Sequence, residues 1–256
     1  MTKVIDIVKI MEDYAPVTLA EQWDNVGLLV GSCNDKVKTV LVALDLDENT
    51  VNEAVNVGAD VIITHHPILL TPINCITDDS VTGRLLIRLI KQNISLYSAH
   101  TNLDTTKGGV NDALAQKLGL TNVEELFTIG FEGSARMGNI KEQTLGAFVD
   151  YVRNMLNSTV IKCIGDKSKQ IKKIAVCGGS GGHMIDGALQ NGCDAIVVGE
   201  AKYSDEQKAY QLGLGLIEAG HFETETIVCE EIAQRLKAVT DNVKIIVSKR
   251  RLTYYE

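Results

Sequence analysis

Two adjacent histidines, His65 and His66, follow the apolar run Val61–Ile63 and precede Pro67. Such a run predicts a buried β-strand, and the proline marks its end. Because successive side chains of a strand alternate between faces, the two imidazoles cannot both enter one packed core. They are suited to bind neighbouring metal ions, since imidazole is the commonest metal ligand. The alternative interpretation is a pair of polar loop residues.

Two further apolar runs also end in a histidine, with a carboxylate four residues later. Residues 94–99 lead into His100, which Asp104 follows, and a later run leads into His221, which Glu225 follows. If a helix begins near His221, the side chains of His221 and Glu225 share one face of its first turn. The alternative interpretation is three unrelated loops.

The ends of the strands in an open α/β sheet converge on one crevice, where ligands bind. We therefore expect these histidines and carboxylates to form one site. Imidazole and carboxylate ligands without cysteine favour zinc, iron, manganese or cobalt over a thiolate site. The candidate ligands exceed what one tetrahedral ion needs, and they suit a two-metal site. The sequence thus predicts two divalent metal ions per chain.

The composition of the chain limits the kinds of partner and the cellular environment that we expect for it. The chain has 256 residues and a formal net charge of −8. No basic stripe is available to release counterions, so nucleic acid is not expected as a partner. No apolar stretch has membrane-spanning length. The six cysteines lack CxxC spacing, which predicts free thiols in a reducing cytoplasm.

The first half of the chain alternates predicted strands and helices, which indicates a parallel sheet covered by helices. The predicted strands are 39–44, 61–64 and 94–99, and the helices are 48–57, 83–92 and 109–118. The glycine-rich stretch 128–138 predicts a connection into a second unit. There we expect helices at 143–156, 187–191 and 204–212, and strands at 160–164, 174–176 and 195–198.

The segment from about His221 must return to the first half if His221 and Glu225 are to join His65 and His66. The first domain is therefore expected to be discontinuous. We predict a metal-binding α/β domain of residues 1–127 plus 221–256, and a second α/β domain of residues 128–220.

Two of three further motifs have two interpretations each. The turn 177–182 predicts either an anion site formed by backbone N–H groups or a tight strand–helix turn. Residues 21–31 contain the only tryptophan and indicate packing plus a turn. The segment 199–203 either lines the same cleft or caps the next helix. His183 is expected at the surface or at a helix start.

Several segments together resemble the GTP cyclohydrolase 1 type 2 homologs, also called NGG-interacting-factor-three-like dinuclear-metal-centre proteins. The segments run in order along the chain: Trp23–Gly31, Thr64–Pro67, Ser98–Asp104, Cys177–Gly181, Gly199–Glu200, and Gly220–His221 with Glu225. The resemblance implies two α/β domains with mixed sheets flanked by helices, the second inserted into the first. It also implies a ring-like homohexamer with metal sites facing an inner cavity.

Carried over by position, the resemblance implies a set of metal ligands: His65, His66, Asp104, His221 and Glu225. His100 matches a motif histidine that is either a ligand or a neighbour of the ligands. Many members have a histidine where this chain has Ser204. The family name implies hydrolysis of GTP to dihydroneopterin triphosphate and formate.

Three functions are compatible with these residues. The first is a dinuclear metal-dependent hydrolase on a nucleotide-like substrate, in which His100 would act catalytically by shuttling protons. The second is a metal-dependent phosphoesterase, since a two-metal site serves either reaction. The third is a non-catalytic metal-binding or regulatory scaffold.

Overall fold

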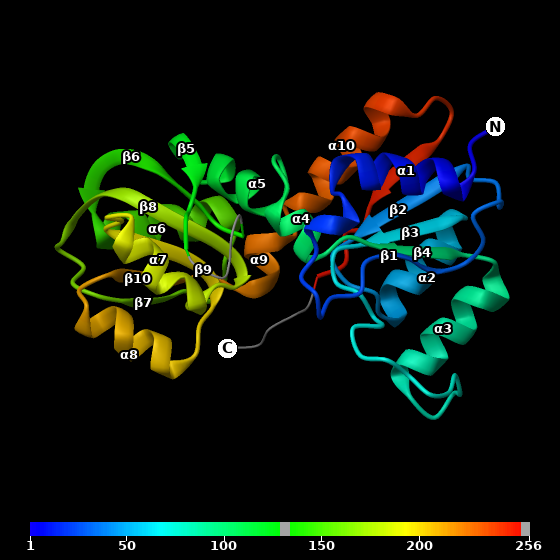
Figure 1. Ribbon diagram of the computed structural model, residues 1–256, viewed down its shortest axis with the longest axis horizontal. Coiled ribbons are helices and arrows are strands. Elements are labelled where there is room, and N and C mark those ends of the chain that lie inside the picture. Colours follow the sequence, from blue (N-terminus) through cyan, green and yellow to red (C-terminus); the bar gives the residue numbers. More distant parts are fainter. Residues whose placement is uncertain (129–133, 252–256) are drawn as a thin grey trace. The chain divides into compact units, whose positions relative to one another are not determined.

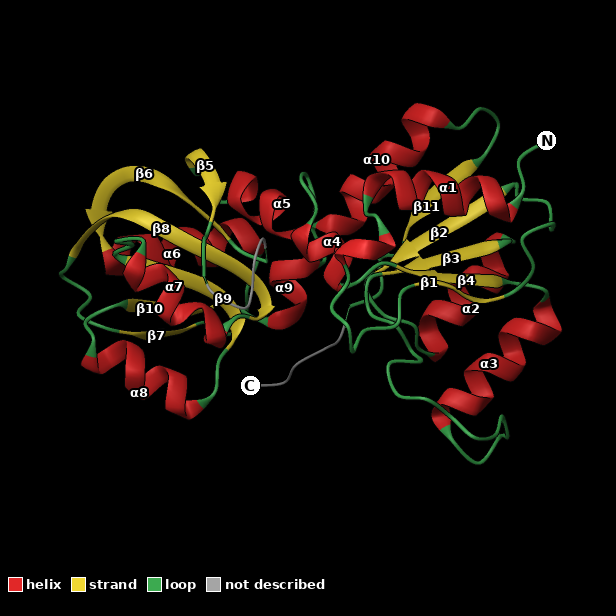
Figure 2. Ribbon diagram, viewed as in Figure 1, coloured by secondary structure: helices red, strands yellow, loops and turns green. Residues whose placement is uncertain are grey.

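The computed structural model describes residues 1–128 and 134–251. It is an α/β structure with two mixed sheets flanked by helices, as Figures 1 and 2 show. The predicted fold class is therefore confirmed. The chain divides into two compact units, one of Met1–Leu103 with Cys229–Glu256 and the other of Asp104–Val228.

The sheet of the first unit has the strand order β1-β4-β3-β2-β11. Its strands are β1 (Gly27–Val30), β2 (Thr39–Ala43), β3 (Val61–Thr64), β4 (Ser95–Ser98) and β11 (Lys244–Val247). The strands β4, β3, β2 and β11 are parallel, whereas β1 pairs with β4 in the antiparallel direction. The parallel sheet predicted for this half of the chain thus needs correction, because it has an antiparallel edge strand.

Helices cover both faces of this sheet, with α1 and α10 on one face and α2 and α3 on the other (Figure 2). The helices are α1 (Val4–Tyr14), α2 (Glu48–Val57), α3 (Val81–Gln92), α4 (Thr101–Thr105) and α10 (Val228–Val239), with a 3₁₀ turn at Val17–Leu19. Helix α2 illustrates why the boundaries were predictable. The side chain of Asp47 accepts a hydrogen bond from the amide of Thr50, and Gly58 ends the helix with a φ of 67°.

The sheet of the second unit has the order β5-β6-β8-β9-β10-β7, in which only β8, β9 and β10 are mutually parallel. Its strands are β5 (Thr121–Glu125), β6 (Arg136–Thr144), β7 (Lys162–Ile164), β8 (Gln170–Ser180), β9 (Ala195–Glu200) and β10 (Gly215–Glu218). Its helices are α5 (Val110–Lys117), α6 (Leu145–Leu156), α7 (Ile185–Gln190), α8 (Tyr203–Gln211) and α9 (His221–Glu225).

Alternate residues of the central strands enter two separate cores, as the period of a strand requires. Ile174 and Val176 of β8 pack with Phe148 of α6, whereas Ala175 packs with Ile185 of α7 on the opposite face. The parallel strands of this sheet are therefore buried on both faces.

The compact units divide at 103/104 and 228/229, not at the expected 127/128 and 220/221. Strand β5 pairs with β6 in the second sheet, and α9 contacts β8 and β9. Both elements therefore belong with the second unit. Of the predicted connection 128–138, residues 129–133 lie outside the described part of the chain, and residues 136–138 already form the start of β6. No helix within residues 1–128 and 134–251 is long and apolar enough to cross a membrane.

Candidate metal centre

His65 and His66 directly follow β3, whose four residues are all buried. His65 is itself buried, whereas the side chain of His66 is 26% exposed. The centroids of the two imidazole rings lie 4.9 Å apart with their planes tilted by 45°. The two rings therefore lie close together instead of on opposite faces, because residues 65 and 66 form a bend past the end of β3, where the alternation of a strand no longer applies.

His100 joins this pair because β4 is the parallel neighbour of β3. The carboxyl ends of neighbouring parallel strands lie at the same edge of the sheet. The His100 ring centroid lies 5.1 Å from that of His65 and 5.5 Å from that of His66. One ring nitrogen from each of the three residues lies within 4.8 Å of the others, a spacing that allows metal binding.

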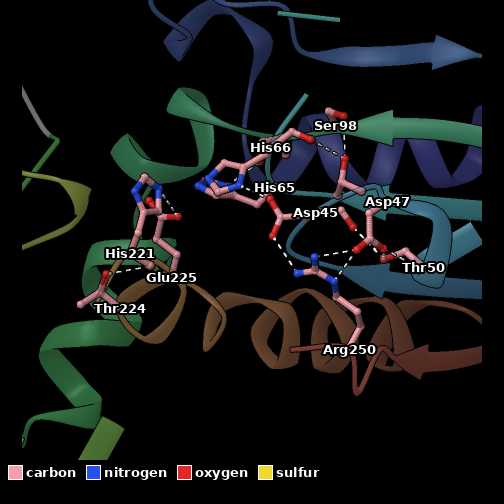
Figure 3. A network of polar contacts seen from close by, with 12 residues as sticks. Asp45, Asp47, Thr50, His65, His66, Ser98, His221, Thr224, Glu225 and Arg250 are labelled. Atoms are coloured by element: carbon pink, nitrogen blue, oxygen red, sulfur yellow. Dashed lines mark hydrogen bonds and ion pairs between the residues drawn. The ribbon is translucent and has the colours of Figure 1, made fainter. Parts of the chain in front are cut away.

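All three imidazoles are fixed through Nδ1 by an oxygen atom. The Nδ1 atom of His65 lies 2.8 Å from the carbonyl oxygen of Ala99. That of His66 lies 2.7 Å from Oδ1 of Asp45, and that of His100 lies 2.9 Å from Oδ1 of Asp24 (Figure 3 shows Asp45 beside His66). An oxygen acceptor places the proton on Nδ1, so the lone pair of the neutral ring lies on Nε2. Metal-binding histidines are held in this way, so the cluster fits a divalent ion.

Asp24 also belongs to this site, although no pattern in the sequence marks it. Its side chain is buried, and it accepts hydrogen bonds from the ring of His100 and from the amide and hydroxyl of Thr101. Burial alone would raise the pKa of Asp24, but these hydrogen bonds outweigh burial and lower it from 3.8 to about 2. Asp24 is therefore ionised at neutral pH and holds His100 in one tautomer.

Asp45 orients His66 in the way that Asp24 orients His100, and no sequence pattern marks it either. The side chain of Arg250 in turn contacts Asp45. Arg250 Nη1 lies 3.6 Å from Oδ2 of Asp45. The guanidinium also donates to Asp47 from Nε at 2.7 Å and from Nη2 at 2.6 Å (Figure 3). Burial acts to raise the pKa of Asp47, but the hydrogen bonds from Thr50 and Arg250 outweigh it and lower that pKa. Arg250 thus orients the carboxylate that orients His66.

We predict that Asp45→Asn weakens divalent-metal binding by about 10- to 100-fold, because removing a carboxylate behind a metal-binding histidine typically costs that much. Competition with a coloured chelator, using cobalt or zinc, measures the change. Asp47→Asn is the matched control, because Asp47 binds the same arginine but caps α2 through Thr50 and does not orient His66. Equal losses in the two variants would contradict a specific role for Asp45.

In the second unit, α9 begins at His221, where the sequence predicted a helix start. His221 Nε2 lies 3.1 Å from Oε2 of Glu225, and Nδ1 lies 3.3 Å from Oε1 of Glu200 (Figure 3 shows His221 with Glu225). The i, i+4 spacing therefore brings His221 and Glu225 together on one face, as predicted. Glu200 belongs to the segment expected to line a cleft or cap a helix, and its carboxylate contacts His221.

Asp104 lies in α4, and its charge acts in the same region of the second unit as that of Glu225. The pKa of the Cys177 thiol is raised mainly by burial, and further by the negative charges of Asp104 and Glu225. The two carboxylates therefore place negative charge in this region, which attracts a cation.

The glycines after Cys177 allow Glu225 to approach the sheet. The residues belong to β8, which has an irregular register between Cys177 and Ser180. Gly179 has a φ of +62°, and a Cβ atom there would lie 2.1 Å from Oε1 of Glu225 and 3.1 Å from Nε2 of His221. Close backbone approach therefore explains this glycine, which the sequence alone left open between an anion site and a turn.

We predict that Gly179→Ala lowers the free energy of unfolding by about 1–3 kcal/mol, since it adds a clash to backbone strain. It should also weaken metal binding, because the Glu225 carboxylate must move. Urea unfolding and metal titration measure these two effects. Gly192→Ala is the matched control, since Gly192 has a φ of +69° and nothing lies within 4 Å of the position that a Cβ atom would take there. Equal effects would show that only the backbone conformation matters.

The structure also locates the remaining residues of the sequence motifs. His183 is exposed in a 3₁₀ turn, Gly182–Met184, as expected for a surface residue. Lys202 is the N-cap residue of α8, and its amide donates a hydrogen bond to the carboxylate of Asp205. Ser204, where many relatives were expected to have histidine, lies within α8. Trp23 is 60% exposed, so the expected packing role of this residue is wrong.

The structure thus brings His65, His66 and His100 together in the first unit, and His221 and Glu225 together in the second. Clustered histidines and carboxylates on mixed α/β sheets are typical of metal-binding proteins, so metal binding is the candidate function of this fold and site. The family model described as Duf34/NIF3 (NGG1p interacting factor 3) matches residues 2–252. The chain belongs to this family.

Similar proteins support the same assignment. A Clostridium perfringens protein named "GTP cyclohydrolase 1 type 2 homolog" is 37% identical, with 99% of each chain covered. The crystal structure of a Staphylococcus aureus hypothetical protein has a TM-score of 0.91 at 27% identity and covers 99% of each chain. A Bacillus cereus protein related to NIF3 has the same TM-score at 24% identity, over 100% of this chain and 99% of that one, which shows the shared fold.

Proposed function

We propose that this chain is a dinuclear metal-dependent hydrolase that acts on a nucleotide-like substrate. The observation that carries the proposal is the clustering of His65, His66 and His100, each held through Nδ1 by an oxygen atom, as metal-binding histidines and their neighbours typically are. The proposed ligands of two divalent ions are His65, His66, Asp104, His221 and Glu225. Zinc, iron, manganese and cobalt all suit this set.

When bound, two divalent ions in such a site would lower the pKa of water and polarise a substrate bond. The protein's own contribution is to fix and orient the groups around that reaction. Asp24 holds Nδ1 of His100, and so the Nε2 atom of His100 is the position at which a proton is accepted and returned. His100 is therefore the proposed catalytic residue, and Asp24 is its positioning residue.

The name that the relatives carry directs the choice of substrate. By that name, the candidate reaction is hydrolysis of GTP to dihydroneopterin triphosphate and formate. The decisive experiment incubates the metal-reconstituted protein with a panel of nucleotides and phosphoesters, and measures metal content on the same sample. Metal-dependent turnover of a nucleotide supports the proposal. Turnover confined to simple phosphoesters would make the protein a phosphoesterase, and stable metal binding without turnover would make it a scaffold.

We further propose that the protein is a homohexamer of the cytoplasm, as its family resemblance implies. Light scattering coupled to size exclusion should then give a mass about six times that of the 27.8 kDa chain. The mass should persist on dilution, since a closed ring buries an interface on every protomer. A dilution-independent monomer would refute this prediction.

A further inference from the structure

A hollow of about 450 Å³ lies in the first unit between the segment before β1 and the loop that follows β3. Its walls are mainly apolar and include Trp23, Leu69, Leu70, Pro72 and Ile73. The volume is within the range of small-molecule sites, about 300–1,000 Å³. None of the described residues that line it is lysine or arginine. The hollow is therefore suited to an uncharged part of a ligand and not to a phosphate.

Trp23 gives the hollow its distinctive chemistry. Large aromatic side chains are usually buried, yet this indole is 60% exposed. Its ring centroid lies 6.0 Å from that of His100, with the planes at 76°. This edge contact places an accessible aromatic ring directly beside the histidine cluster.

Hydrogen bonds fix the two walls of the hollow. Asp24, the residue after Trp23, is bound to both His100 and Thr101. Asn25 Nδ2 donates to the carbonyl oxygen of Leu69 at 2.7 Å, which joins the Trp23 segment to the opposite loop. The carboxylate of Asp24 is the one charge on the described lining, and its oxygens are occupied by these donors. A ligand ring would therefore enter a preorganised site, which limits the entropic cost of binding.

We propose that this hollow is a subsite for the planar aromatic heterocycle of the substrate, which stacks against Trp23. The subsite rests on the proposed function, because it assumes that the substrate carries such a ring. Stacking on an indole holds any heterocyclic base through its π-face. Asn25 and Thr71 on the same lining supply polar groups that can bond the edge of the ring.

The chain contains one tryptophan, so its fluorescence reports on this hollow alone. The probes are guanosine, adenosine and uridine 5′-monophosphates, with ribose 5-phosphate as the matched compound without a ring. We expect saturable quenching by the nucleotides and none by ribose 5-phosphate. The quenching should persist after chelation, because none of the proposed metal ligands lines the hollow. Absence of quenching by all three nucleotides would overturn the subsite.

Variants test whether Trp23 itself holds the ring. By calorimetry, Trp23→Leu should raise the nucleotide Kd about tenfold or more, whereas Trp23→Phe should keep most of the affinity. Leu70→Ser retains the indole, so weaker quenching by nucleotides in this variant reports on the opposite wall. Tyr210→Leu is the control, because Tyr210 is 71% exposed on α8 in the other unit.

The outcomes separate the subsite from the proposed function. Specific quenching without turnover of any nucleotide would refute the hydrolase and leave the subsite standing. Turnover with a KM that Trp23→Leu does not change would refute the subsite and leave the hydrolase standing. If Trp23→Leu changed only the oligomeric mass and not the Kd, Trp23 would belong to an interface between copies of the chain, and the subsite would be wrong.

Discussion

Replacement of His66 or Glu225 by alanine should remove metal from the protein without unfolding it. His66 lies past the end of β3 and is partly exposed, so its loss leaves no cavity in the core. Glu225 is only 4% exposed, and its carboxylate is held beside His221. Removal of a buried carboxylate also removes its desolvation penalty, which offsets part of the cost of losing the contact with His221, so the metal-free variant should stay folded.

Metal analysis after reconstitution measures this prediction, together with urea unfolding of the metal-free protein. We expect two ions per chain in the wild type and fewer than two in each variant. His183→Ala is the matched control, because His183 is the one histidine outside the proposed site and is exposed. If Glu225→Ala retained both ions at wild-type affinity, Glu225 would not be a ligand.

The histidine cluster could be predicted from the sequence because its determinants are local. The run Val61–Thr64 is apolar and short, and the histidines follow it directly. Residues 94–99 end in the same way at His100. Two such segments with a helix between them form parallel neighbours in most α/β folds, and their ends then coincide. Nothing beyond this reasoning was needed to bring the three imidazoles together.

The carboxylates that orient these histidines could not be predicted in the same way. Asp24 is 76 positions from His100, and Asp45 is 21 positions from His66. Their pairing depends on the order of strands in the sheet and on the course of the segment before β1. That strand, Gly27–Val30, has only one fully buried residue, so no alternating pattern marks it.

The unit boundaries were missed for a related reason. All five residues of β5 are exposed, so the strand carries no apolar signal that assigns it to the second sheet. It is held instead by pairing with β6. The role of Gly179 could not be predicted either, because the sequence does not show that the carboxylate of Glu225 approaches this glycine.

Replacement of His100 by glutamine should lower kcat/KM by about 100- to 10,000-fold, the contribution typical of a positioned proton-transfer group. The rate is measured on the compound of the panel that the wild type turns over best. Both metal ions should remain bound, because His100 is proposed to move protons and not to hold an ion. Glutamine keeps a polar side chain of similar length at this position, which limits any structural change.

Asp24→Asn provides the companion test of the same mechanism. A carboxylate at Asp24 requires the proton of His100 to reside on Nδ1, whereas an amide permits the opposite tautomer. The variant should therefore lose rate in the same direction as His100→Gln while it keeps its metal content. If His100→Gln lost an ion in parallel with its rate, His100 would be a ligand. If it retained the rate within a fewfold, proton transfer would have to be assigned to another residue.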